Sequence, residues 1–252
     1  YPHNSPYAFS ENRLLDAVEL EGLEAFFIHG TKSNRKRWTE NGKTLVEGLT
    51  SRSRSSTYND DFSWADDVVT TEVQQGKYKT HTITKSRKRN YLHNDENDRA
   101  IAAKKLVNHV LDNQKEGETV TLIGHSHGGN VAIQAASTLQ EKHGIVADVI
   151  TIATPAYNDD DSKESASKLK GVHLHIYNSI DGVDFWAGGT EEFSNNKTHN
   201  VEVDASSKYS LIEWLDAHSF DSNHQKEFLD ALDNAIEGTT LEKGIKQNME
   251  SK

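Results

Sequence analysis

The sequence predicts an α/β protein with a mostly parallel sheet, because strand-like and helix-like segments alternate along its 252 residues. Four short runs rich in Val, Ile, Leu and Phe end in Gly, Ser, Thr or Asn, which is typical of strands buried on both faces. These predicted strands cover 24–30, 118–126, 146–154 and 171–179. Three segments carry apolar residues at helical spacing, and they cover 97–117, 128–144 and 223–238. This order indicates βαβ units with helices on both faces of a central sheet.

The predicted helices also carry start and stop signals. The helix over 97–117 begins at a capping-type residue, Asn97 or Asp98, and ends at Gly117. The next helix ends at Gly144, because glycine accepts the left-handed conformation that closes many helices. Near the C-terminal end, the run "NKTHNVEVD" around His199 has strand-like alternation.

Two segments depart from this alternation. Residues 76–97 carry six Lys and Arg residues before an acidic run, in a place where an α/β unit needs only a short connection. They form either a lid or insertion, or a solvated loop. Residues 239–252 contain few apolar side chains and predict a flexible polar tail. We assign 23–238 to a single α/β domain.

Charge and composition exclude several classes of function. The net charge of −11 argues against a nucleic-acid partner, since duplex binding needs a basic face. No run approaches the roughly 20 apolar residues that span a bilayer, and the first residues do not resemble a signal peptide. The sequence has no cysteine, which rules out disulfides, thiolate metal sites and a cysteine nucleophile. We expect a soluble protein.

The strongest chemical signal is "GHSHG" at 124–128, which fits the pattern G-x-S-x-G. It follows the strand-like "VTLI" and opens the helix-like "GNVAIQAASTL", so Ser126 is predicted to stand on a sharp strand-to-helix turn. Glycines at 124 and 128 fit a crowded turn in which a Cβ atom would collide with its neighbours. We therefore predict that Ser126 is a nucleophile rather than part of a plain turn.

A seryl hydroxyl needs a base and an acid that orients the base, and on a strand-turn-helix scaffold these follow the serine in the order acid, then histidine. The acid is predicted to be Asp181, just after the strand over 171–179, with Asp184 as the alternative. The base is predicted to be His218, in a polar loop before the last helix. His224 ranks second as the base, and His199 ranks third because it fits a surface strand.

Acyl transfer also requires donors for the oxyanion. The backbone N–H of His127, directly after the nucleophile, is the first expected donor. The second is the N–H of Thr31, in the loop "FFIHGTKSN" after the first strand. His29 in the same loop is expected to be structural.

A metal site is the competing interpretation of the same stretch. His125 and His127 form an H-x-H pair at a strand end, and His173 and His175 share one face of another strand. We favour the serine nucleophile and expect no metal and no cofactor. The aspartate groups 159–161 and 60–61 lack the spacing of calcium loops and are expected to be solvated.

The segments "IHG", "GHSHGG" and "IATP" together resemble the α/β-hydrolase family, and within it the lipases and esterases. The resemblance covers roughly residues 23–238. It implies a mostly parallel sheet and gives the role of nucleophile to Ser126, of acid to Asp181 and of base to His218.

Residues 1–22 carry a second resemblance. The pieces "SPYAFSENR" and "ELEGLE" are similar to the end of the Rhs (YD-repeat) core, where it passes into a variable C-terminal toxin domain. The resemblance implies that 1–22 is a remnant of a larger secreted shell protein and that the rest is its cargo. It would explain export without a signal peptide, and it implies a cognate immunity protein.

These observations predict a serine ester hydrolase, of the lipase or phospholipase type, that acts as an antibacterial toxin on a lipid or another ester. The basic segment 76–97 could meet an anionic membrane surface, where each Lys or Arg is worth about 1 kcal/mol. Two alternatives stay open: a metal-dependent hydrolase using His125 and His127, and an α/β-hydrolase that only binds.

Overall fold

The computed structural model describes residues 24–31, 36–39, 42–53, 55, 57–64, 70–74, 80–84, 96–114, 119–178, 189–203 and 225–236. The strands are β1 (Glu24–Ile28), β2 (Thr57–Asn59), β3 (Thr70–Gln74), β4 (Thr80–Thr84), β5 (Val120–His125), β6 (Asp148–Ile152), β7 (His173–Tyr177) and β8 (Thr198–Glu202). The helices are α1 (Lys36–Thr39), α2 (Lys43–Arg52), α3 (Glu96–Asn113), α4 (His127–Thr138) and α7 (Gln225–Ile236). A π-helical turn, Leu139–His143, extends α4, and a short 3₁₀ helix covers Ala166–Lys168.

Six strands form the central sheet in the order β2-β1-β5-β6-β7-β8. Every neighbouring pair is parallel, so the strands all end at one edge of the sheet. The predicted parallel α/β architecture is therefore confirmed. The four predicted strands correspond to β1, β5, β6 and β7, and the three predicted helices to α3, α4 and α7.

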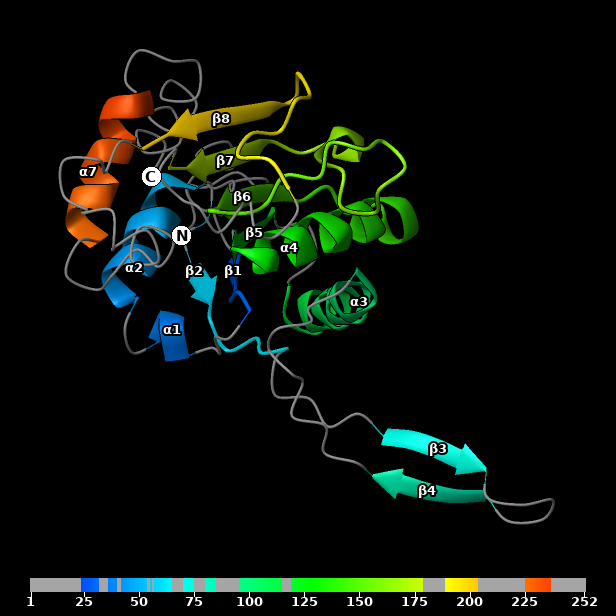
Figure 1. Ribbon diagram of the computed structural model, residues 1–252. Coiled ribbons are helices and arrows are strands. Elements are labelled where there is room, and N and C mark those ends of the chain that lie inside the picture. The colour runs from blue at the N-terminus through cyan, green and yellow to red at the C-terminus, as the bar shows by residue number, and fades with distance from the viewer. Residues whose placement is uncertain are drawn as a thin grey trace, which may run out of the picture.

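Helices cover both faces of this sheet (Figure 1). On one face, α3 and α4 pack over side chains such as Phe26 and Leu122. On the other face, α1, α2 and α7 pack over Phe27 and Ile123, the residues that directly follow Phe26 and Leu122 in β1 and β5. Successive residues of a strand point to opposite faces, so a strand buried on both sides is a continuous apolar run. Each large apolar side chain that is buried stabilises the fold by about 1.5–3 kcal/mol.

The helix that follows Ser126 ends at Gly144, as its sequence predicts. Gly144 has φ of 71°, in the left-handed region, and directly follows the π-helical turn. Its position is open, with no atom that a Cβ would meet within 4 Å. Glycine is therefore needed there for its backbone conformation rather than for space.

Strands β3 and β4 form a separate antiparallel hairpin, which Figure 1 shows away from the six-stranded sheet. Of the possible lid or insertion at 76–97, the structure describes β4 and the first two residues of α3. The predicted remnant at 1–22 and the predicted tail at 239–252 lie outside the described residues. In the described part of the chain, no helix combines the length and apolar character needed to cross a membrane.

Candidate active site

Ser126 occupies a strained turn between β5 and α4. Its φ and ψ are 53° and −137°, a conformation that non-glycine residues rarely adopt and that costs about 1–3 kcal/mol. Two backbone hydrogen bonds hold it: the Ser126 N–H donates to Ile152 O at 2.9 Å, and its carbonyl accepts from the Gly129 N–H at 2.9 Å. The predicted strand-turn-helix geometry around Ser126 is present.

Glycines make this turn possible because three backbones meet there. A Cβ at Gly124 would lie 2.5 Å from the Gly128 carbonyl oxygen and 2.5 Å from Gly129 Cα. A Cβ at Gly128 would lie 2.5 Å from the carbonyl oxygen of His29, in the loop after β1. Real Cβ atoms do not approach backbone atoms so closely, so the start of α4 packs directly on β5 and on the β1 loop.

The loop after β1 lies against the serine. A Cβ at Gly30 would be 2.8 Å from Ser126 Cβ and 3.0 Å from His125 O. Thr31, which follows, is partly buried. The loop that was expected to supply an oxyanion donor is thus beside Ser126, as is His127, the first residue of α4.

His29 is fully buried at the start of this loop. Its Nδ1 lies 2.9 Å from Gly30 O, and its Nε2 lies 3.3 Å from the backbone nitrogen of Trp64. The imidazole stacks on the Trp64 indole, with ring centroids 5.7 Å apart and planes 8° apart. The Trp64 Nε1–H donates to His29 O at 2.8 Å. His29 therefore connects the β1 loop to the segment after β2.

The two histidines beside the nucleophile differ in their environment. His125 is the last residue of β5 and is buried, with its Nδ1 close to the position that a Cβ at Gly30 would occupy. It therefore packs against the β1 loop. His127 is half-buried at the first turn of α4. In the described residues, no three His, Asp or Glu side chains gather in the manner of a metal-ligand set.

The predicted acid and base can be located only by the strands that precede them. β7 ends at Tyr177 and β8 ends at Glu202, at the same edge of the sheet as Ser126. Asp181, Asp184, His218 and His224 lie outside the described residues. His199 is exposed within β8, three residues before the strand's last residue. β8 also lies three strands from β5, about 14 Å across the sheet, so His199 is a strand residue at a distance from Ser126.

His173 and His175, the candidate metal ligands on the other strand, form a buried series of hydrogen bonds instead. The Thr151 hydroxyl lies 2.9 Å from His173 Nε2 and 2.8 Å from His175 Nδ1. On their other sides, His173 Nδ1 faces the Thr198 hydroxyl at 2.9 Å and His175 Nε2 faces Glu191 O at 2.7 Å. All four ring nitrogens are thus engaged with hydroxyl or carbonyl groups.

The donors and acceptors in this series of hydrogen bonds can be assigned from His175 to His173. His175 Nε2 faces a carbonyl oxygen, so it carries the proton, and its Nδ1 accepts from the Thr151 hydroxyl. The Thr151 oxygen then accepts from His173 Nε2–H. Burial lowers the pKa of His175 to about 4, against smaller opposing effects of the Glu191 carbonyl and the Glu192 carboxylate. Burial, followed by the nearby His175, also lowers the pKa of His173. Both rings are neutral near pH 7.

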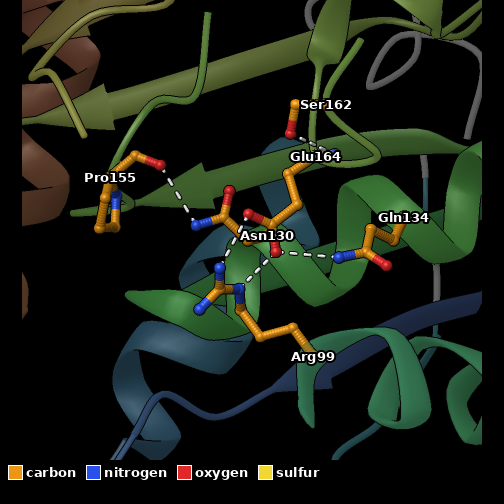
Figure 2. Close-up of polar contacts among 6 residues, drawn as sticks. All are labelled: Arg99, Asn130, Gln134, Pro155, Ser162 and Glu164. Atoms are coloured by element: carbon orange, nitrogen blue, oxygen red, sulfur yellow. Dashed lines mark hydrogen bonds and ion pairs between the residues drawn. The ribbon is translucent and has the colours of Figure 1, made fainter. Parts of the chain in front are cut away.

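Buried polar contacts link α3, α4 and the segment that follows β6 (Figure 2). The Arg99 guanidinium of α3 donates to both carboxylate oxygens of Glu164, and Gln134 Nε2 of α4 donates to Glu164 Oε1 at 2.9 Å. Asn130, one helical turn after Ser126, donates to Pro155 O at 3.2 Å. Arg99 and Glu164 are 5% and 2% exposed, so the charges compensate each other inside the protein.

Sequence reasoning missed this network, although one signal was present. Arg99 stands three, four and seven residues before Ala102, Ala103 and Leu106, which are all buried, so it occupies the apolar face of its helix. A charged residue on that face indicates a buried partner. Glu164 gave no such signal, because it lies in a polar run that resembles any solvated loop.

The family model for the thioesterase domain matches residues 75–207, just over half of the chain. The chain belongs to the thioesterase domain family. It is therefore a hydrolase-type protein of the α/β-hydrolase superfamily, and the predicted α/β-hydrolase fold is confirmed. None of the curated proteins matches the chain.

Several solved structures are similar to this thioesterase-family chain. ClbQ of the colibactin NRPS/PKS pathway is 12% identical, with a TM-score of 0.48 over 88% of this chain and 99% of that one. The NocB thioesterase domain, solved as a covalent complex with a fluorophosphonate nocardicin G analog, is 16% identical, with a TM-score of 0.45 over 86% and 95%. Dienelactone hydrolase from Anabaena variabilis is 17% identical, with a TM-score of 0.45 over 83% and 86%.

The thioesterase match covers only some of the predicted catalytic residues. It contains Ser126, Asp181 and Asp184, and it ends after β8. His218 and His224 follow it, and so does α7. The β1 loop with Thr31 precedes it, although that loop packs directly on the matched elbow.

Proposed function

We propose that this thioesterase-family protein is a serine hydrolase that cleaves an ester or thioester through an acyl-enzyme at Ser126. The observation that carries the proposal is the strained turn at Ser126, between β5 and α4, with the β1 loop packed against it. Strain at one non-glycine residue, kept in place by surrounding glycines, is a common property of functional sites. The same turn places the positive end of the α4 dipole beside the seryl oxygen.

In the proposed reaction, His218 accepts the proton of the Ser126 hydroxyl as its oxygen attacks the acyl carbon. The carbonyl oxygen becomes an oxyanion, which accepts hydrogen bonds from the N–H groups of Thr31 and His127. The leaving alcohol or thiol takes the proton from His218, and the acyl group stays on Ser126. Water, deprotonated by His218, then attacks the acyl-enzyme and releases the acid. Asp181 orients His218 and stabilises its charged form.

The topology of the sheet supports Asp181 and His218 in these roles. Neighbouring strands lie about 4.8 Å apart, so the ends of β5 and β7, two strands apart, are separated by about 10 Å. Asp181 follows the end of β7 by four residues, which can span up to about 13 Å. His218 follows the end of β8 by sixteen residues, which is ample for the three-strand distance to Ser126.

For the substrate, we propose an acyl oxyester or thioester, with lipids as the leading class. Family membership supports an ester or thioester, and the resemblance to lipases and esterases supports a lipid acyl group. The Lys and Arg residues of 76–97 would favour an anionic phospholipid surface. Because the chain has a net charge of −11, such attraction has to be local to that segment.

For the biological role, we propose an antibacterial toxin delivered as part of a larger Rhs-type protein and neutralised by an immunity protein. The support is the resemblance of residues 1–22 to the end of an Rhs core. The role predicts that the hydrolase stops growth when it is directed to the compartment where its lipid or ester lies. The Ser126→Ala variant should leave growth unchanged at the same expression level.

The enzymatic proposal is tested by hydrolysis assays on wild type and Ser126→Ala. p-Nitrophenyl esters of rising chain length, acyl thioesters and phospholipid vesicles of defined headgroup distinguish the substrate classes. Loss of the nucleophile should lower kcat at least about a thousandfold on whichever class is cleaved. Hydrolysis that survives in Ser126→Ala would contradict the proposal.

The alternatives give different outcomes in the same assays. A metal-dependent hydrolase using His125 and His127 would lose its activity to a chelator and keep it in Ser126→Ala. A protein that only binds would show no Ser126-dependent hydrolysis of any substrate. His218→Ala and His224→Ala separate the two candidate bases, since only the true base should abolish turnover.

A further inference from the structure

His29 makes a hydrogen bond whose position bears directly on the proposed oxyanion site. Its Nδ1 lies 2.9 Å from Gly30 O, the carbonyl of the peptide unit whose N–H belongs to Thr31. The peptide is trans, so its carbonyl and its N–H point in opposite directions in one plane. Holding the Gly30 carbonyl therefore fixes the direction of the Thr31 N–H.

The partners of His29 determine which ring nitrogen carries the proton. Gly30 O can only accept, so His29 Nδ1 must donate to it. The backbone nitrogen of Trp64 can only donate, so His29 Nε2 accepts at 3.3 Å. The Ser63 hydroxyl is also 3.3 Å from Nε2. These partners select the neutral Nδ1–H tautomer.

A restraint is needed at this peptide because Gly30 has no side chain to limit its backbone. Glycine is required there by the approach of Ser126, since a Cβ would lie 2.8 Å from Ser126 Cβ. The freedom of glycine would otherwise let the Gly30–Thr31 peptide rotate away from Ser126. A mispositioned donor contributes little, because oxyanion stabilisation depends on donors aimed at the developing charge.

The backbone carbonyl of His29 lies beside the start of α4, close to His127, the other expected donor. His29 O lies where a Cβ at Gly128 would be only 2.5 Å away, and Gly128 directly follows His127 in α4. Trp64 fixes His29 O through its Nε1–H at 2.8 Å and fixes the imidazole by stacking. Trp64 thus holds both the imidazole and the backbone carbonyl of His29, and that carbonyl lies against the start of α4.

We infer that the His29 side chain is a positioning group that presents the Thr31 N–H to the oxyanion formed at Ser126. The inference rests on the proposed function, because it needs an acyl transfer at Ser126. His29 does not touch the reacting atoms and exchanges no proton with the substrate. It acts through the Gly30–Thr31 peptide.

Two substitutions separate the two hydrogen bonds of the imidazole: the one that Nδ1 donates to Gly30 O, and the one that Nε2 accepts from the backbone N–H of Trp64. In His29→Asn, the amide nitrogen takes the place of Nδ1 and can still donate to Gly30 O. In His29→Gln, the longer side chain places its amide near the position of Nε2. There it can accept from the backbone N–H of Trp64, but it cannot donate to Gly30 O. The two amides differ by a single methylene, so each is the control for the other.

The assays are kcat and KM on a soluble p-nitrophenyl ester, and inhibition by a trifluoromethyl ketone that forms a tetrahedral adduct with a seryl oxygen. His29→Gln should lower kcat about ten- to a hundredfold, less than complete loss of one oxyanion donor, with KM changed less than about threefold. Its affinity for the ketone should fall by a similar factor, because the adduct carries the oxyanion. His29→Asn should keep kcat within about threefold of wild type.

The outcomes distinguish this inference from the proposed function. If wild type has no Ser126-dependent hydrolysis, the proposed function fails and this inference fails with it. If hydrolysis depends on Ser126 but both His29 variants behave alike, or kcat falls without weaker ketone binding, only the inference is overturned. Circular dichroism reports whether each variant folds. Should His29→Gln not fold, Trp64→Phe provides the second test: it removes the Nε1–H bond to His29 O and part of the ring that stacks on the imidazole, so it should lower kcat and ketone affinity together, and unchanged values would overturn the inference.

Discussion

Lowering the pH from 7 to 4 should destabilise this protein through the buried His175. Its pKa is lowered to about 4 by burial, whereas an unfolded histidine has a pKa near 6.5. Above pH 6.5 the ring is neutral in both states, and the stabilising effect is fully present. Between pH 6.5 and 4 the unfolded chain binds a proton that the folded protein does not, so the free energy of unfolding decreases. Below pH 4 both states are protonated and the contribution is gone.

The magnitude follows from the difference of about 2.5 between the two pKa values. At about 1.4 kcal/mol per pKa unit, it corresponds to about 3.5 kcal/mol over the whole titration, of which about 3 kcal/mol is lost between pH 7 and 4. The pKa of His173 is lowered in the same direction and adds to the effect. Domains are stable by only about 5–15 kcal/mol, so this loss is a large fraction of the total.

The assay is urea unfolding followed by tryptophan fluorescence at several pH values from 7 to 4. His175→Gln removes the titrating ring and keeps an amide that can donate to Glu191 O. Its free energy of unfolding should depend less steeply on pH, by about 3 kcal/mol across the range. His143→Gln, at an exposed imidazole of the π-helical turn, is the control and should follow wild type. Parallel curves for wild type and His175→Gln would refute this reasoning.

Two further substitutions test the turn at Ser126 and the buried contact between Arg99 and Glu164. Gly124→Ala places a Cβ 2.5 Å from backbone atoms of the next turn, so it should destabilise the fold by about 1–3 kcal/mol or more and reduce hydrolysis, as measured by urea unfolding and ester turnover; a variant with wild-type values would contradict the packing. Glu164→Gln leaves the Arg99 charge buried and should cost about 3–5 kcal/mol in urea unfolding, more than replacing Arg99 with Met and Glu164 with Leu together. A pair of apolar replacements that cost more than Glu164→Gln alone would contradict that account.

The sequence predicts those parts of the fold that depend on periodicity and local punctuation. β5, Ser126 and α4 are predictable because a short apolar run, a glycine-flanked serine and a helical repeat follow one another. Gly144 ends its helix for a purely local reason, a positive φ. These features depend on neighbours in the chain, so they can be interpreted without tertiary structure.

The remaining parts depend on contacts between distant segments. β2 has three residues, Thr57–Asn59, and its strand character comes from pairing with β1 rather than from its own pattern. His29 gave a sequence signal only as part of a loop, because its partner Trp64 is 35 residues away. Glu164 likewise meets Arg99 across 65 residues. Such pairs leave no period or motif in a single sequence.

The candidate acid and base also depend in part on local sequence order and in part on tertiary structure. The sequence orders Asp181 and His218 after Ser126, and the parallel sheet brings the ends of β5, β7 and β8 to one edge. The choice between Asp181 and Asp184, or between His218 and His224, depends on how the loops return to that edge. Loop conformation is determined by packing against the rest of the protein, and it has no periodic signature.

The central claim is that Ser126 is an activated nucleophile, and covalent labelling tests it most directly. Folded wild type and Ser126→Ala are incubated with a fluorophosphonate, and intact mass and peptide mapping locate the adduct. A single adduct on the peptide containing Ser126 is predicted for wild type, with none in Ser126→Ala. Equal labelling of the two proteins, or no labelling of a wild type that still hydrolyses esters, would contradict the account.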